Sequence, residues 1–136
     1  MPELIIGRTA ERSLTVGERD TAVQWGSGNV RVLSTPHLIA LMEGAAVDAV
    51  DPNLPAGQQT VGTRVEVEHL AATPVGGRVT ARATLVSVDG RRLRFEVLAE
   101  DGAGLIGRGT HERVIVDVTR FMARASARVT PRPEEY

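Results

Sequence analysis

The chain has 136 residues, of which 42% are apolar and 24% are charged, and its formal net charge is −1 at pH 7. These values predict one soluble globular domain with a buried core and no general electrostatic attraction for polyanions. Aromatic residues make up 3% of the chain and cysteine is absent. The composition therefore argues against a base-stacking surface and excludes disulfides, zinc-thiolate sites and cysteine nucleophiles.

The N-terminal segment and the hydropathy of the chain bear on its location. The first residues, MPELIIGRTAERS, contain an apolar run of only three residues with no basic leader before it, so we expect no signal peptide. No apolar stretch has the length of a membrane-spanning helix. We therefore expect a single domain over residues 1–136, located in the cytoplasm, with neither a membrane nor a nucleic acid as partner.

The first half of the chain contains one long helix pattern. RTAERSLTV (8–16) is a candidate first strand, and a Gly/Ser-rich loop follows it. The segment STPHLIALMEGAAVDAV (34–50) then predicts a helix, because Pro36 suits the first helical position and Ser34 or Thr35 suits the N-cap. The segment DPNLPAGQQ, with two prolines and a glycine, ends this helix.

Alternating strand patterns occupy the second half of the chain. In GTRVEVEHLAATP (62–74), the residues from Thr63 to His69 alternate in polarity, which predicts a strand with one buried face. Thr63, Val65, Val67 and His69 share the predicted buried face. Two further runs, at 77–90 and 91–102, are joined at Asp89-Gly90, a strong hairpin signal, and 105–118 is a long final strand.

These elements predict an α+β fold in which a curved antiparallel sheet wraps a central helix. The order of a helix followed by four strands suggests a meander, in which each strand pairs with the next. Such a sheet leaves open edges, so we expect two copies of the chain to pair edge to edge.

The C-terminal segment contains Arg120, Arg124 and Arg128 at a spacing of four residues. This spacing is typical of a solvated helix face, and phosphate binding is the alternative. Residues 129–136 are expected to form a frayed tail.

Glu43 is the first candidate functional residue, because it interrupts a helix that is apolar on nearly every side. Such a helix is predicted to be buried. Glu43 then either reaches solvent through a gap in the core or pairs with an arginine, and either role is structural. Alternatively, burial raises the pKa of the carboxyl and prepares it as a base or nucleophile. The adjacent Gly44 would allow close approach by another backbone or a ligand.

His69 and Thr35 are the other two candidates. A lone histidine on the apolar face of a strand is usually a core residue, but its unperturbed pKa also suits general acid–base catalysis. Thr35 has a structural role if it is the N-cap, yet helix N-termini also stabilise anions and developing oxyanions. No metal is expected, because the three histidines are scattered and THERV (110–114) lacks the second histidine of a metal motif.

Four segments together resemble the fluoroacetyl-CoA thioesterase family of hotdog-fold proteins over residues 33–128. They are LMEGAAVDAV, GTRVEVEHLAATPVG, SVDGRRLRFEV and IGRGTHERVIV, in this order and at these separations. The resemblance implies a single hotdog domain, a homodimer or tetramer formed through the sheets with active sites at the subunit interface, and hydrolysis of an acyl-CoA thioester without a metal or bound cofactor.

The resemblance also assigns site residues. The catalytic threonine, glutamate and histidine of the family fall on Thr35, Glu43 and His69. The glycine that helps to hold the acyl carbonyl falls on Gly62, and an arginine near the acyl pocket falls on Arg113. Whether Glu43 acts as general base or as nucleophile is open at this stage.

One departure from the family concerns the acyl group. The fluoroacetyl-specific enzyme carries phenylalanines just before its threonine, whereas the corresponding segment here, GSGNVRVLS, has no aromatic residue. This difference argues against selectivity for a fluorinated acyl group but leaves hydrolysis of a small or medium acyl-CoA as the expected reaction.

Two alternative functions are considered. The first is a hotdog protein that binds acyl-CoA without turnover. The second is a hotdog hydratase, which relies on an aspartate–histidine pair that is not found in this sequence.

Overall fold

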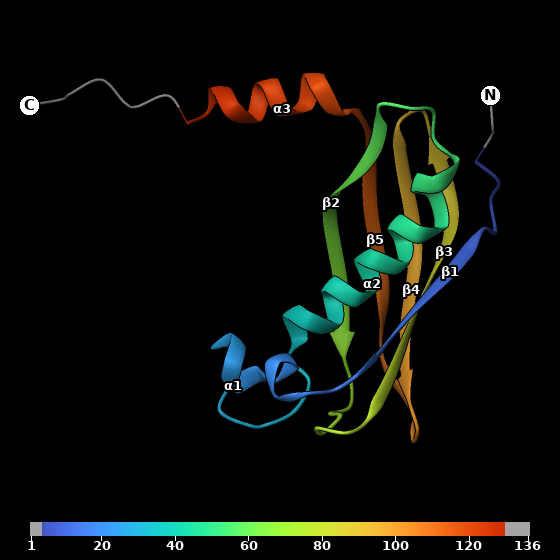
Figure 1. Ribbon diagram of the computed structural model, residues 1–136. Helices are drawn as coiled ribbons and strands as arrows, with labels where there is room; N and C mark the ends of the chain where they lie inside the picture. Colours follow the sequence, from blue (N-terminus) through green and yellow to red (C-terminus); the bar gives the residue numbers. More distant parts are fainter. Residues whose placement is uncertain (1–3, 130–136) are drawn as a thin grey trace, which may run out of the picture.

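The computed structural model describes residues 4–129, in which a long helix lies across one face of an antiparallel sheet (Figure 1). The α-helices and strands are α1 (Ala22–Trp25), α2 (Thr35–Val50), α3 (Val118–Ala127), β1 (Thr9–Thr15), β2 (Gln58–His69), β3 (Arg78–Asp89), β4 (Arg92–Asp101) and β5 (Gly104–Asp117). Short 3-10 helices at Glu18–Asp20 and Asp51–Asn53 flank α1 and α2. The predicted α+β class, with the sheet curved around the helix, is confirmed.

The order of the strands differs from the expected meander. The sheet runs β1-β3-β4-β5-β2, with antiparallel pairs throughout. β3, β4 and β5 follow one another as expected, but β2 pairs with β5 and not with β3. The segment between β2 and β3 therefore crosses from one edge of the sheet toward the other. As a result β2, which carries two of the predicted site residues, is an edge strand.

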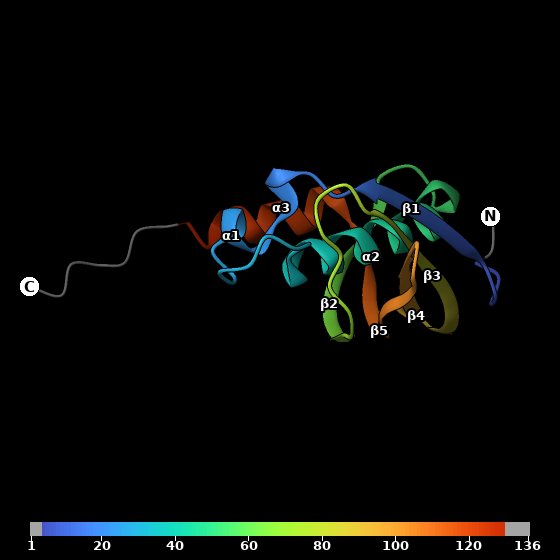
Figure 2. The same cartoon turned by 90° about the horizontal axis from the view of Figure 1, so that it is seen from below.

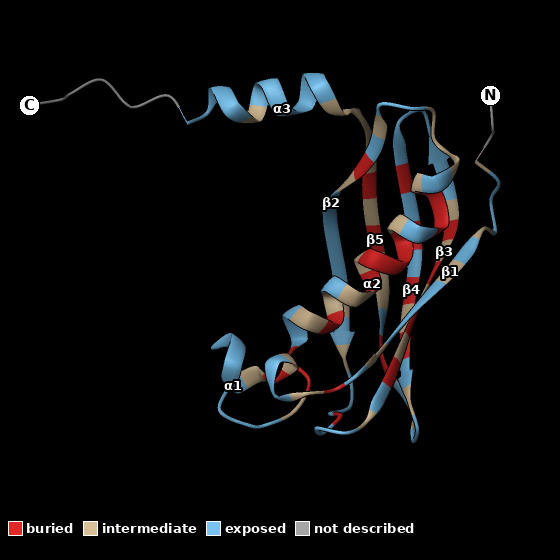
Figure 3. Cartoon of the chain, viewed as in Figure 1, coloured by how far each residue is buried: buried red, intermediate tan, exposed pale blue. Residues whose placement is uncertain are grey.

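The core lies between α2 and the sheet, and small residues dominate it. Leu38, Met42 and Phe95 are among the largest buried side chains, each at most 1% exposed. Alanines fill much of the remaining core, at positions 45, 46, 49, 81, 83 and 99. The prediction that α2 is buried on every side is wrong, because the sheet covers only one side of it and Ala40 and Asp48 are exposed (Figure 3).

A β-bulge alters the predicted alternation of β2. Gly62 pairs with Arg113 and Arg64 pairs with Glu112, so Thr63 is an extra residue opposite neither partner. A bulge of this kind shifts the phase of alternation by one residue. Gly62 therefore shares the helix-facing side of β2 with Val65, Val67 and His69, and Thr63 does not belong to that alternation.

The three arginines at spacing four do belong to a helical segment at the end of the chain. Arg120 and Arg124 lie in α3, and Arg128 is its C-cap. α3 contains no buried residue, in agreement with the predicted solvated helix face. Of the predicted tail, residues 130–136 lie outside the described part of the chain. Across residues 4–129, no helix combines the length and apolar character needed to cross a membrane.

We predict that the core tolerates loss of Phe95 poorly. The ring is fully buried, so Phe95→Ala should lower the free energy of unfolding by about 3–5 kcal/mol through lost burial and a residual cavity. Urea denaturation at a fixed protein concentration measures the change. Val88→Ala is the matched control, because Val88 is 41% exposed and should shift stability by no more than about 0.5 kcal/mol. Equal effects of the two substitutions would contradict the assigned core.

Candidate active site

Thr35 and His69 are in direct contact, as the sequence predicted for two members of one site. The Thr35 hydroxyl lies 2.8 Å from Nδ1 of His69. The hydroxyl is free for this contact because Ser34 is the N-cap of α2 and accepts the hydrogen bond from the backbone N–H of His37. The N-cap role considered for Thr35 therefore belongs to its neighbour.

The imidazole of His69 is half-buried and poised as a neutral group. Burial lowers the pKa of His69 below its ordinary value, since removal from water disfavours the charged ring. Nε2 is buried and has no hydrogen-bond partner within residues 4–129. The backbone of Ala71 interacts with the ring and offsets part of this lowering of the pKa. A neutral imidazole of this kind can exchange a proton with a bound molecule.

Glu43 lies against Gly62, on the side of the helix that faces β2. A Cβ built on Gly62 would stand 2.7 Å from Oε2 of Glu43, so any larger residue would push the carboxylate away. The Glu43 side chain is 39% exposed. The structure therefore gives it both access to solvent and an arginine neighbour, Arg113, whose NH1 lies 3.7 Å from Oε2.

Arg113 is held by a chain of buried hydrogen bonds. Its Nε donates to the Thr60 hydroxyl at 2.8 Å and its NH2 to the Thr60 carbonyl at 2.9 Å. The Thr60 hydroxyl in turn donates to Oδ1 of Asp51 at 2.6 Å. Burial lowers the pKa of Arg113, yet a guanidinium remains charged at neutral pH. The network therefore holds a fixed cation beside Glu43.

His111 completes this group and was not among the predicted site residues. Nε2 of His111 accepts from NH1 of Arg113 at 3.1 Å and lies 3.9 Å from Oε2 of Glu43. Because Arg113 can only donate, Nε2 carries no proton, and Nδ1–H donates to the Arg64 carbonyl at 2.8 Å. Burial first, and then the charge of Arg113, lower the pKa of His111. The alternation of His111 with Arg113 on one face of β5 was the available sequence signal.

Within one chain, the five predicted residues form two groups and not one. Thr35 and His69 form the first group, and Glu43, Gly62 and Arg113 form the second. Thr35 and Glu43 are separated by about 12 Å along the helix, given a rise of about 1.5 Å per residue. That distance exceeds hydrogen-bond reach, so the two groups do not cooperate directly inside a single copy.

A surface hollow lies beside the first group, the Thr35–His69 pair. A hollow of 260 Å³ includes Thr35 and His69 in its lining, together with Ala22, Ser27, Val32, Leu33, Leu70, Ala71 and Ala72. Small apolar side chains beside a hydroxyl and an imidazole suit a short acyl group.

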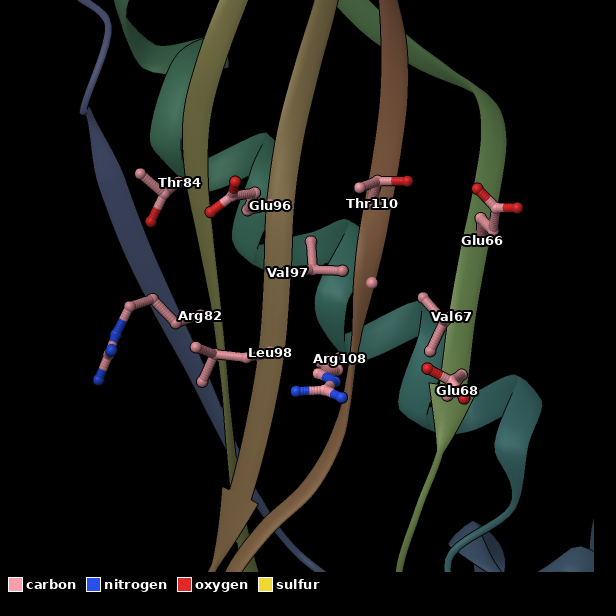
Figure 4. A pocket seen from close by; sticks show the side chains of 11 residues that line it. Glu66, Val67, Glu68, Arg82, Thr84, Glu96, Val97, Leu98, Arg108 and Thr110 are labelled. Atoms are coloured by element: carbon pink, nitrogen blue, oxygen red, sulfur yellow. The ribbon is translucent and has the colours of Figure 1, made fainter.

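A larger hollow, of 680 Å³, lies on the face of the sheet opposite α2 (Figure 4). Its ionisable residues include Glu66, Glu68, Arg82, Glu96 and Arg108. None of the predicted site residues lines it. Because acids and bases alternate across a broad sheet face there, we interpret it as the solvated outer surface of the sheet and not as the reactive site.

Two further expectations concern close approach and metals. The group that approaches Gly44 is the Arg12 side chain from β1, whose Nε also pairs with Oδ2 of Asp48 at 2.7 Å. Gly44 therefore lies against a structural arginine.

Among residues 4–129, no cluster of three or more histidine, aspartate or glutamate side chains is placed to hold a metal ion. The expected independence from metals stays a prediction.

Comparison with known proteins points to one family. A family model described as fluoroacetyl-CoA-specific thioesterase matches residues 16–119. A fluoroacetyl-CoA thioesterase from Streptantibioticus cattleyicolor is 46% identical over 93 residues, which cover 68% of this chain and 67% of the relative.

Solved structures give the same result. A variant of the fluoroacetyl-CoA thioesterase FlK in complex with acetyl-CoA is 35% identical, with a TM-score of 0.87 over 93% of this chain and 99% of that one. A hot-dog-like protein from Thermanaerovibrio acidaminovorans is 30% identical, with a TM-score of 0.84 over 93% and 94% of the two chains. These likenesses confirm the expected hotdog fold.

We predict that stability falls when the buried histidines become protonated. His69 and His111 have folded-state pKa values below the ordinary value, so the unfolded chain binds more protons as the pH falls below about 6.5. The free energy of unfolding should therefore be constant above that pH and decrease below it. Urea denaturation between pH 8 and pH 5 measures this dependence.

The non-titrating variant His111→Gln is the control for this prediction and should show a shallower pH dependence. Titration of the imidazole signals by NMR measures the two pKa values directly. Values above the ordinary histidine pKa would contradict the neutral rings described above.

Proposed function

The chain belongs to the fluoroacetyl-CoA-specific thioesterase family of hotdog-fold proteins, and on this premise we propose that it hydrolyses a small or medium acyl-CoA at sites shared between two copies. As a member of this family it is a thioester hydrolase. The assignment of residues, the composition of the site and the dimer are the new parts of the proposal.

The observation that supports a shared site is the position of the two residue groups along one open edge strand. Gly62, with Glu43 beside it, belongs to the first half of β2, whereas His69, with Thr35 beside it, is the last residue of β2. When two copies of an edge strand pair antiparallel about a two-fold axis, the first half of each strand meets the last half of the other. The Glu43 group of one copy then faces the Thr35–His69 pair of its partner.

Glu43 and Gly62 supply the chemistry at the carbonyl. The Gly62 backbone N–H donates to the thioester oxygen, where negative charge develops, and the missing side chain lets the acyl group lie beside the Glu43 carboxylate. Glu43 either takes a proton from water as the water attacks the carbonyl carbon, or attacks it to form an anhydride that water then cleaves. In both routes the carbon–sulfur bond breaks, and the products are a carboxylic acid and the thiol of CoA.

His69 and Thr35 supply the proton for the leaving group. If the Thr35 hydroxyl donates to Nδ1, then the proton of the neutral ring is on Nε2, the nitrogen without a partner. That proton passes to the departing thiolate. The hydroxyl fixes this tautomer, so Thr35 orients the acid.

Arg113 acts as a positioning residue. Its guanidinium is fixed by Thr60 and lies 3.7 Å from the Glu43 carboxylate. This contact directs the carboxylate toward Gly62.

We assign no selectivity for a fluoroacetyl group. The nearest aromatic residue before Thr35 is Trp25, whose ring packs edge-on against His37 and does not line the Thr35–His69 hollow. Hydrolysis without a cofactor and a cytoplasmic location stay predictions.

We predict that Glu43→Gln abolishes most of the activity. Loss of the base or nucleophile should lower kcat by about a hundred- to ten-thousandfold, while CoA binding persists. Release of free thiol, followed over a panel of acyl-CoAs of different length and polarity in the presence of a chelator, measures this effect. Glu66→Gln on the outer face of β2 is the matched control and should keep the parent rate. Binding of acyl-CoA without turnover by the parent protein would contradict the proposal and favour a carrier or sensor.

A second prediction tests the shared site directly. Glu43→Gln and His69→Ala are each expected to be inactive, but a mixed dimer of the two holds one site with both native residues. Unfolding and refolding an equimolar mixture should therefore restore about a quarter of the parent activity, the statistical yield for random pairing in a two-fold dimer. If both residues acted within one chain, every site in the mixture would carry a defect and no activity would return.

A further inference from the structure

α3 is an amphipathic helix whose apolar side is only partly covered by its own chain, where Phe121 lies beside the end of β5. Phe121 is 39% exposed, Met122 is 52% exposed, and Val129 just beyond the helix is 80% exposed. The helix as a whole contains no buried residue. A ten-residue helix is marginal in isolation, and helical stability in proteins comes mostly from packing of the apolar face. The apolar side of α3 therefore needs a partner surface.

The register of the sheet determines where α3 begins. Asp117, the N-cap of α3, pairs with Gln58, the first residue of β2. Figures 1 and 2 show that α3 then extends beyond the open β2 edge, on the side of the sheet that carries α2. The helix thus points into the space that a second copy would occupy if it paired along β2.

Two-fold symmetry identifies the surface that α3 would meet, and this step rests on the dimer proposed above. Antiparallel pairing places the Gln58 end of one β2 beside the His69 end of the other. The segment that follows His69, residues 70–75, therefore lies next to α3 of the partner. Residues 70–72 of that segment line the Thr35–His69 hollow.

The surface at that end has the chemistry to receive α3. Leu70 is 49% exposed and Val75 is 40% exposed, so the segment offers apolar area. The ionisable side chains of the sheet at this end, such as Glu68 and Arg108, lie on the face opposite α2, so the contact with α3 on the α2 side would be apolar.

We propose that α3 of each copy packs across residues 70–75 of its partner and forms one wall of the partner's Thr35–His69 hollow. Met122 and Phe121 supply the apolar contact. Each active site is then built from three parts: the Glu43 group, the partner's Thr35–His69 pair, and an α3 wall from the chain that supplies Glu43. The segment before Thr35, GSGNVRVLS, has no aromatic side chain to cover the hollow. The α3 wall would supply apolar cover in its place.

Cysteine cross-linking tests this placement, and the absence of native cysteine gives a clean background. We expect oxidation to link Leu70→Cys with Phe121→Cys, Met122→Cys or Ala125→Cys in at least one double variant. Inside one chain the two positions lie near opposite ends of β2, about 40 Å apart at roughly 3.3 Å per residue. A disulfide requires Cα atoms within about 7 Å, so the bond must join two copies and yields a covalent dimer on non-reducing gels.

Leu70→Cys combined with Ala123→Cys is the matched control, because Ala123 lies away from the apolar stripe of α3. This pair and the single-cysteine variants should stay uncross-linked. A dimeric parent protein in which no stripe pair cross-links, or in which the control pair links equally well, would overturn the proposal. Cross-linking does not depend on hydrolysis, so this result is separable from failure of the proposed function.

Kinetics give an independent readout. Met122→Asp should raise KM by about tenfold, the loss expected when one buried methionine-sized contact is removed, whereas Ala123→Asp should leave KM unchanged. An unchanged KM in Met122→Asp would contradict the wall. If stripe pairs do not cross-link and Arg120→Ala or Arg124→Ala raises the inhibition constant of free CoA, then α3 binds substrate phosphates and the proposal is wrong.

Discussion

The close packing of α2 against the sheet is the constraint on which the rest of the molecule depends. Alanines on the helix face alanines on the strands, and small side chains on both layers let the helix approach the sheet closely. A Cβ on Gly107 would come within 3.0 Å of Leu38, and one on Gly62 within 2.7 Å of the Glu43 carboxylate. The second contact places the Glu43 carboxylate beside Gly62, where the strand has no side chain. A bulkier core would move the helix outward and separate Glu43 from Gly62.

A buried polar network holds the cation that accompanies this acid. Arg113 is 6% exposed and His111 is 1% exposed, and a charge buried to this degree is costly unless hydrogen bonds satisfy it. Thr60 satisfies the guanidinium from two atoms and is itself held by Asp51. His111 is fixed in one neutral tautomer between Arg113 and the Arg64 carbonyl. The network therefore provides a rigid support for Glu43, and burial within it lowers the pKa of His111.

The edge strand β2 links the fold to the proposed function. An edge strand exposes unpaired backbone groups, which proteins either protect or use for association. Here the same strand carries Gly62 in its first half and His69 at its end, with the bulge at Thr63 setting both on the helix side. Association along β2 would satisfy the open edge, unite the two residue groups and provide a surface for α3. One symmetric contact would thus complete the sheet, the site and the terminal helix together.

The sequence by itself determined the local elements and their chemistry. Polarity alternation, the Asp89-Gly90 hairpin and the Ser34-Thr35-Pro36 start each depend on neighbours in the chain, and the strands and α2 follow them closely. Family motifs selected Thr35, Glu43 and His69, but could not give their distances. Only the tertiary structure decided that β2 pairs with β5, that Thr35 contacts His69, and that His111 and Arg113 lie beside Glu43. These features arise from contacts between residues far apart in the chain, where the free energy of packing and burial, not local propensity, selects the partner.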